Sequence, residues 1–187
     1  MGAELWQELA PWNPDPGIAL RELQARYLAD KIDFPGEVRE SLRNAKETVR
    51  FTQEQGDEYN VLSIYQADLA YLEDVVSRPL PTDPQERIDI LRRIHASGGQ
   101  GLGNVLDIES VCDATEFGDE GWPLVSHPLP DDDLRAAFGS ATPTIEQAKK
   151  AGCGFATRLG RGESVCFPVY DEIGQPVGWW FAGCTID

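Results

Sequence analysis

The chain is short of cationic side chains. Its 187 residues hold 16 Lys and Arg against 32 Asp and Glu, which gives a formal net charge of −16. Nucleic acids and anionic membranes are both held by cationic surfaces, so this balance argues against either as a partner and favours a basic protein. The shortage is uneven, because no Lys or Arg occurs between Arg93 and Arg135.

Cysteine is also scarce, with four residues at positions 112, 153, 166 and 184. They form no CxxC pair, and their spacing fits no zinc ribbon. We interpret them as small, mostly buried hydrophobic side chains of a protein in a reducing compartment.

Histidine is limited to His95 and His127, so a triad of nucleophile, histidine and acid would have to use one of them. Cys112 with His127 is the one tempting pair, with Asp107 or Asp113 to orient the ring. No GxSxG elbow accompanies it. We therefore expect no catalytic residue.

The chain lacks a long apolar run. No 18 consecutive residues are apolar, and the start, MGAELWQELAPW, has neither the basic nor the apolar region of a secretory signal. Trp6 stands where a myristoylation pattern needs Ser or Thr. We expect a cytoplasmic protein that is not attached to a membrane.

The first half of the sequence has the pattern of helices. Residues 1–14 are expected to be irregular because of their prolines. Asp15 and Pro16 then begin a helix that runs to about residue 29. An apolar stripe predicts a second helix over about 37–55, and a third is expected over about 58–77. Asp83 followed by Pro84 predicts the start of a fourth, which ASGGQG ends.

The second half has the pattern of strands with two short helices. We expect a strand over 103–111, a long acidic loop, a short helix beginning at PDDDL, and another helix capped by Thr142 and ending at Gly152. Residues 163–170 and 176–186 then form a hairpin with the turn DEIGQ. Pro168 predicts a sheet edge or a bulge. Trp179 and Trp180 should lie on opposite faces, and we expect both to be packed.

These elements predict a single α+β domain over residues 1–187. Its helical part covers about 1–97 and its α/β part about 98–187. We expect the N-terminal helices to pack on a small, mainly antiparallel sheet that the C-terminal hairpin closes.

The most distinctive stretch runs from Leu102 to Leu134, with nine acidic residues and no base. Its segment DATEFGDE contains a glycine among acids but does not match the spacing of an EF-hand loop, so we expect no metal and no cofactor. Carboxylates and one tryptophan of this stretch are the candidate contacts to a partner: Asp113, Glu116, Asp119, Glu120, Trp122, Asp131, Asp132 and Asp133.

Three motifs in residues 88–187 resemble an uncharacterised family of small bacterial proteins. They are Leu106-Asp107-Ile108 followed by Cys112-Asp113, then Phe138-Gly139 with Thr142-Pro143-Thr144, and finally Phe181-Ala182-Gly183 with Asp187. The family pattern has Ser where this chain has Cys112, and Thr where it has Ser140. The resemblance implies an α+β fold closed by a terminal hairpin and brings no activity with it.

Taken together, these features predict a non-catalytic acidic binding protein. We expect an inhibitor, or an immunity-type partner, of a basic protein such as a bacterial toxin. Two alternatives stay open at this point: a metal-dependent hydrolase that uses loop carboxylates, and a DNA-mimic protein.

Overall fold

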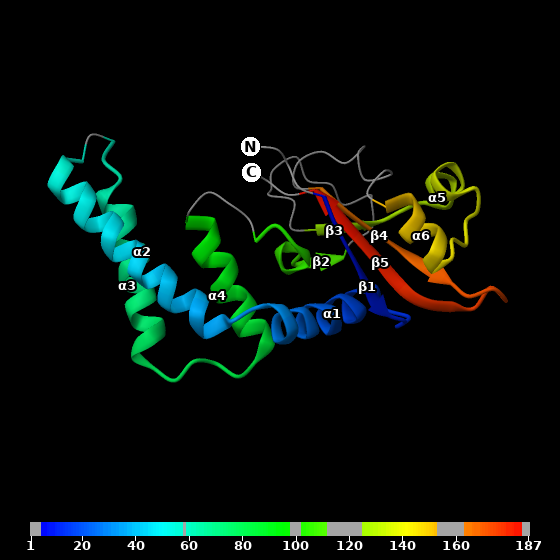
Figure 1. The fold of residues 1–187 in the computed structure, drawn as a ribbon, viewed down its shortest axis with the longest axis horizontal. Coiled ribbons are helices and arrows are strands. Elements are labelled where there is room, and N and C mark those ends of the chain that lie inside the picture. Colours follow the sequence, from blue (N-terminus) through cyan, green and yellow to red (C-terminus); the bar gives the residue numbers. More distant parts are fainter. Residues whose placement is uncertain (1–4, 58, 98–101, 112–124, 153–162, 185–187) are drawn as a thin grey trace. The chain divides into compact units, whose positions relative to one another are not determined.

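The computed structural model describes residues 5–57, 59–97, 102–111, 125–152 and 163–184 (Figure 1). The chain divides into two compact units. Unit 1 combines residues 1–27 with residues 100–187, and unit 2 is the intervening segment 28–99. Among the helices of these ranges, none combines the length and the apolar character needed to cross a bilayer.

Unit 1 is built on a five-stranded sheet with the order β1-β5-β4-β3-β2 (Figure 1). The strands are β1 (Leu5–Pro11), β2 (Ser110–Val111), β3 (Val125–Pro128), β4 (Ser164–Tyr170) and β5 (Pro176–Cys184). The long pairings of β5 with β1 and with β4 are antiparallel, and the short pairings of β3 with β4 and with β2 are parallel. The α+β class is confirmed, with a mixed and open sheet.

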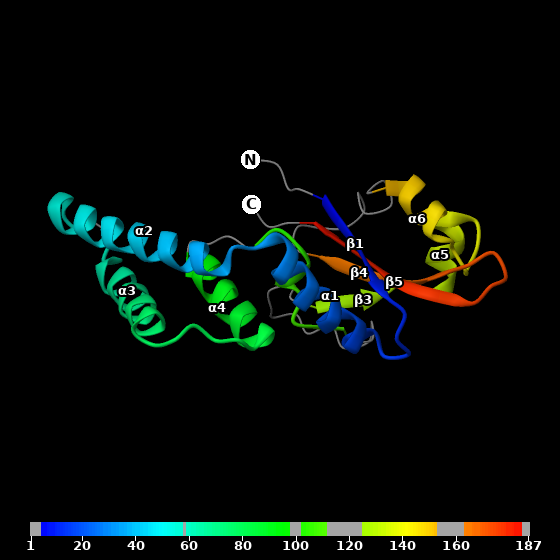
Figure 2. The ribbon, with the colours of Figure 1, turned by 60° about the horizontal axis from the view of Figure 1, so that its bottom comes forward.

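The sheet is covered on both faces (Figure 2). On one face α5 (Asp131–Phe138) and α6 (Ile145–Ala151) pack on β4 and β5. The buried residues of this cluster are Leu134, Ala148, Val165, Phe167, Val169, Trp180 and Ala182. The other face is covered by the first part of α1 (Pro16–Lys31) and by the 3-10 turn η1 (Val105–Asp107).

The two neighbouring tryptophans are both packed, as expected. Trp180 is 4% exposed within the cluster under α5 and α6. Trp179 points to the opposite face and stacks on Trp12, with ring centroids 5.7 Å apart. Its indole nitrogen donates a hydrogen bond to the carbonyl oxygen of Asn13 at 2.8 Å. Because side chains alternate between the two faces of β5, these adjacent tryptophans pack on opposite sides of the sheet.

The expectation of an irregular N-terminus is wrong for residues 5–11, which form β1 and pair with residues 178–184 of β5. The prolines that suggested irregularity do not interrupt the strand, because Pro11 is its last residue. β1 is an edge strand, where a proline at the end removes no ladder hydrogen bond that the sheet needs.

The expected strand over 103–111 is also wrong, apart from its last two residues in β2. The side chain of Asn104 accepts a hydrogen bond from the Leu106 amide, and the Asp107 carboxylate accepts from the amides of Leu102 and Gly103. These side-chain contacts close the backbone into η1 instead. Val105 and Leu106 are fully buried by this turn.

Pro168 lies within β4, where the prediction of an edge or bulge is confirmed locally. The carbonyl of Cys166 faces β3 and accepts a hydrogen bond from the amide of Leu129, just past the end of β3. Pro168 is two residues further along β4, so its nitrogen faces the same side, at a point where β3 has already ended. No donor is required there. The register shifts one residue further along, between Val169 and Tyr170.

One predicted helix cap is confirmed and another is displaced. Asp83 caps α4 (Pro84–Ser97), accepting from the Glu86 amide at 2.9 Å. The expected cap of α6 at Thr142 is wrong. Thr144 takes that position and forms a capping box with Gln147. The Thr144 hydroxyl accepts from the Gln147 backbone amide, and the Gln147 side-chain oxygen accepts from the Thr144 backbone amide.

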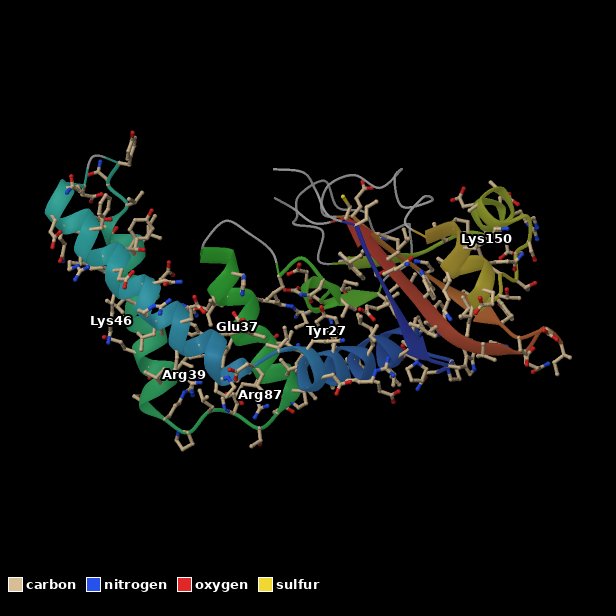
Figure 3. All side chains as sticks on the ribbon, in the orientation of Figure 1. Tyr27, Glu37, Arg39, Lys46, Arg87 and Lys150 are labelled. Atoms are coloured by element: carbon tan, nitrogen blue, oxygen red, sulfur yellow. The ribbon has the colours of Figure 1, made fainter. Side chains whose placement is uncertain are left out.

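Unit 2 consists of the antiparallel pair α2 (Phe34–Gln55) and α3 (Leu62–Ser77), together with α4. The buried residues of these helices are Phe34, Val38, Val49, Leu72, Val75, Ile88, Ile90 and Leu91. Lys46 pairs with Glu73 across α2 and α3 at 3.6 Å. In Figure 3, Glu37, Arg39 and Lys46 mark successive positions along α2.

Candidate functional site

The acidic first turn of α5 is the part of the predicted contact surface that the structure describes. One face of the helix packs on the sheet, because Leu134 is buried there and Phe138 packs on Phe167 with ring centroids 5.1 Å apart. Gly139 ends it in the left-handed conformation, with φ at 77°, which glycine adopts without strain. The packed apolar face leaves the opposite face of α5 to solvent.

The three carboxylates of this turn are exposed. The side chains of Asp131 and Asp132 have 71% and 95% of their surface accessible, and Asp133 is exposed as well. None of them caps the helix, since the cap position is Pro130 and no side-chain cap bond forms. Their favourable contribution comes from the positive end of the helix dipole, about 0.3 to 1 kcal/mol each.

Arg135 neutralises part of this charge from within the same helix. Its guanidinium lies 2.9 Å from Asp132 and 3.4 Å from Asp131. Both pairs are solvent-exposed, so each adds little stability. The turn keeps a net charge of −2, with three carboxylates and one guanidinium.

The surroundings add further carboxylates at the same end of unit 1 (Figure 1). Glu146 in the first turn of α6 pairs with Lys149, and Lys150 lies next to it on the same helix (Figure 3). The β4–β5 turn contributes Asp171 and the exposed Glu172. Asp171 is occupied locally, accepting from the amides of Ile173 and Gln175 at 3.0 and 2.8 Å. This end of the unit is therefore acidic with a few interspersed cations.

The remaining predicted contact residues lie outside the described residues. These are Asp113, Glu116, Asp119, Glu120 and Trp122. Cys112, the nucleophile of the tempting pair with His127, also lies outside them. Their role in binding stays a prediction.

His127 lies on β3, directly opposite Val165 of β4, and is half-buried. Asp107, one of its two suggested orienting acids, serves the backbone: both of its carboxylate oxygens accept amide hydrogen bonds at 2.7 Å. Within the described ranges, His, Cys, Asp and Glu form no group of three that could hold a metal ion.

Two of the four cysteines are described, and both are buried free thiols, Cys166 and Cys184. Burial raises the pKa of Cys166 to about 12, although the nearby Ser126 side chain favours a lower value. A thiol with this pKa remains protonated at neutral pH, and the thiolate is the form that attacks. Cys166 is therefore a packing residue, as the sequence indicated.

Unit 2 has a set of exposed apolar side chains that was not predicted from the sequence. Phe51, Tyr59 and Ile64 have 64%, 78% and 56% of their surface accessible. The signal was present in the sequence, because Phe51 lies off the stripe of Val38, Leu42, Ala45 and Val49 that defines the packed face of α2. An apolar residue outside such a stripe is a candidate for a contact that the helix pair does not make.

Comparison with protein-family models, with curated proteins and with solved structures gives no match for this chain. The family resemblance of residues 88–187 stays a prediction. We therefore infer a function only from the charges and contacts of the chain itself.

Proposed function

We propose that this protein is a non-catalytic binding protein whose partner is a basic protein, with the role of an inhibitor or an immunity-type partner. The observation that carries the proposal is the concentration of negative charge in unit 1. Residues 1–27 and 100–187 contain 18 acids and 7 bases, whereas residues 28–99 contain 14 acids and 9 bases. The exposed first turn of α5 belongs to the more acidic unit.

Such a charge imbalance affects association through the summed electrostatic potential of the surface. A single exposed ion pair contributes at most about 1 kcal/mol, but the summed potential of a charged face raises the rate at which an oppositely charged protein arrives. It also discriminates against acidic partners by repulsion. Salt weakens the attraction, because the Debye length falls to about 8 Å at physiological ionic strength.

The proposed cellular compartment is based on the state of the cysteines. Cys166 and Cys184 are free and buried, which suits a reducing environment. We propose the cytoplasm as the place where the protein meets its basic partner.

Affinity capture from native cell lysate, at low salt and at high salt, tests the proposal. The wild type should recover one stoichiometric basic protein at low salt and less of it at high salt. Changing Asp131, Asp132 and Asp133 together to Asn should reduce the recovery, since it removes exposed carboxylates at the most acidic turn that is described. Circular dichroism checks that α5 stays folded in this variant.

A matched control neutralises three exposed helical carboxylates of residues 28–99, by changing Asp30→Asn, Glu40→Gln and Asp89→Asn together. It removes the same amount of charge and should keep most of the recovery. Absence of a basic protein at low salt would refute the proposed function. Equal losses in the two triple variants would show that net charge, and not the face of unit 1, selects the partner.

A further inference from the structure

Trp12, the residue after β1, carries an aromatic surface that is open to solvent. Its ring stacks on the ring of Trp179, with centroids 5.7 Å apart and planes 9° from parallel. Trp179 is 8% exposed, whereas Trp12 is 38% exposed. Trp179 covers one face of the Trp12 ring, so the exposed area belongs to the opposite face and to the ring edge. We name this stacked pair the tryptophan platform.

Val177 extends the tryptophan platform at the same end of the sheet. Pro11 of β1 pairs with Gly178 of β5, so Trp12 and Val177 are the next residues outward from that pair. Side chains alternate along β5, which puts Val177 on the face that Trp179 occupies. Val177 is 39% exposed. This corner of the sheet therefore offers an aromatic face together with an aliphatic side chain.

The tryptophan platform is held in place by hydrogen bonds of the segment that follows Trp12. The Trp179 indole nitrogen donates to the carbonyl oxygen of Asn13 at 2.8 Å. The side-chain oxygen of Asn13 accepts from the Asp15 amide at 3.0 Å, and the Asp15 carboxylate accepts from the Gly17 amide at 2.7 Å. A site that is fixed in this way loses little conformational entropy when a partner binds.

The described residues around the tryptophan platform carry more negative than positive charge. Over residues 5–27 the acids are Glu8, Asp15 and Glu22, the bases are Arg21 and Arg26, and the β4–β5 turn adds the acids Asp171 and Glu172. Arg26 is directed to the carbonyl oxygen of Leu9 at 2.8 Å. Five carboxylates against two guanidinium groups favour a cationic occupant.

Arginine is the cationic side chain that suits this corner best. The face of an indole ring attracts a cation, and a planar guanidinium can stack on it as well. The aliphatic stem of an arginine packs on apolar surface while the charged group stays near water. The chain makes the same kind of contact within unit 2, where Arg93 lies 3.8 Å from the centroid of the Tyr71 ring.

We infer that the tryptophan platform is an anchor site for an arginine side chain of the basic partner. The guanidinium stacks on the open face of Trp12, and the stem lies along Val177. Asp15 adds electrostatic attraction, since three residue steps place its Cα atom at most about 11 Å from that of Trp12. This inference rests on the proposed function, because it assumes a basic partner.

Short peptides test the site in the full-length protein at low salt. The probe is an acetylated peptide amide of alternating Gly and Arg. A matched peptide has citrulline in place of each Arg, which keeps the planar head group and removes its charge. Heteronuclear NMR spectra follow the indole N–H signal of Trp12, which is assigned by its disappearance in Trp12→Phe.

The arginine peptide should shift the Trp12 indole signal, and its own arginine methylene signals should move upfield, because protons above an aromatic ring are shielded. Trp12→Leu should weaken binding by about two- to fivefold, the factor that an exposed cation–π contact supplies. Phe51→Leu is the matched control, because it removes an exposed aromatic ring from unit 2 and should leave binding unchanged.

Trp12→Phe keeps a ring against Trp179 and should bind with intermediate affinity. It also keeps the test decisive if Trp12→Leu does not fold, which circular dichroism in urea shows. The citrulline peptide should bind more weakly than the arginine peptide to the wild type.

Several results would overturn the inference. Equal shifts with the citrulline peptide would exclude a cation as the occupant. An unchanged Trp12 signal during saturable binding of the arginine peptide, or equal binding by Trp12→Leu and Phe51→Leu, would place the site elsewhere. A shift caused by cellohexaose but not by the arginine peptide would identify a sugar as the occupant.

Lysate capture separates this inference from the proposed function. A basic partner that Trp12→Leu recovers as well as the wild type does would refute only the arginine site. Binding of the arginine peptide at Trp12 without any captured basic protein would refute only the proposed function.

Discussion

Gln24 offers a direct test of how unit 1 is held together. Its side chain is 1% exposed, and its amide nitrogen donates to the carbonyl oxygens of Val105 at 2.9 Å and Ile108 at 2.6 Å. These two bonds join α1 to η1. Gln24→Leu keeps the approximate size of the side chain and removes both donors.

The expected loss is about 2 to 4 kcal/mol in the free energy of unfolding. A neutral hydrogen bond contributes about 1 kcal/mol, and a buried carbonyl that loses its donor costs about 1 to 3 kcal/mol. The Val105 carbonyl also accepts from the Ile108 amide at 3.3 Å, which keeps its share of the loss near the lower figure.

Tryptophan fluorescence in urea is the appropriate measurement, because all five tryptophans belong to unit 1 and none to residues 28–99. Gln175→Leu, at an exposed glutamine on the β4–β5 turn, is the control and should change stability by less than about 0.5 kcal/mol. If both variants unfold at the same urea concentration, the two bonds from Gln24 do not stabilise the unit, and η1 is held by the contacts of Asn104 and Asp107 and by burial of Val105 and Ile108.

Three further changes should alter stability in defined directions. Gly183→Ala would place its Cβ 2.4 Å from the Trp6 ring, so we expect a loss of about 1 to 3 kcal/mol by urea unfolding and a changed near-UV circular dichroism spectrum. Thr144→Ala removes the cap of α6 and should cost about 1 kcal/mol, whereas Thr142→Ala should cost less; equal effects would contradict the assignment of the cap. The pKa of Cys166, raised to about 12, lies above its unfolded value of about 9, so the unfolded state loses its proton first. The free energy of unfolding should fall by about 2 kcal/mol between about pH 8 and pH 10.5, and Cys166→Ala should abolish that part of the decline; an identical decline in the variant would show that other groups cause it.

The helices and the C-terminal hairpin could be predicted because their signals are local. Asp83 with Pro84 begins a helix in any context, and the stripe from Val38 to Val49 defines a packed face without knowledge of its neighbour. The hairpin of β4 and β5 combines β-branched and aromatic runs with a short turn, so its partner strand is also close in sequence.

β1 and η1 could not be predicted because their determinants are distant or depend on side-chain hydrogen bonds. β1 pairs with a strand at the other end of the chain, and nothing near Leu5 indicates that partner. The apolar residues Val105, Leu106 and Ile108 suggested a strand, but the contacts of Asn104 and Asp107 with the backbone favour a turn. Of the predicted contact surface, Asp131–Asp133 are the described part, and the structure places them on a helix with Arg135.

The division of the chain has a consequence for its synthesis. Asn13, beside β1, reaches its partner Trp179 across 166 positions of sequence, and the whole of unit 2 is made between them. At about 5 to 20 residues per second, ribosomes would need about 8 to 33 s to make that interval. All of unit 2 is synthesised during this time, while β1 and residues 16–27 of α1 still lack β5. The nascent segment around Trp6 and Trp12 therefore stays without its β5 partners until the end of synthesis.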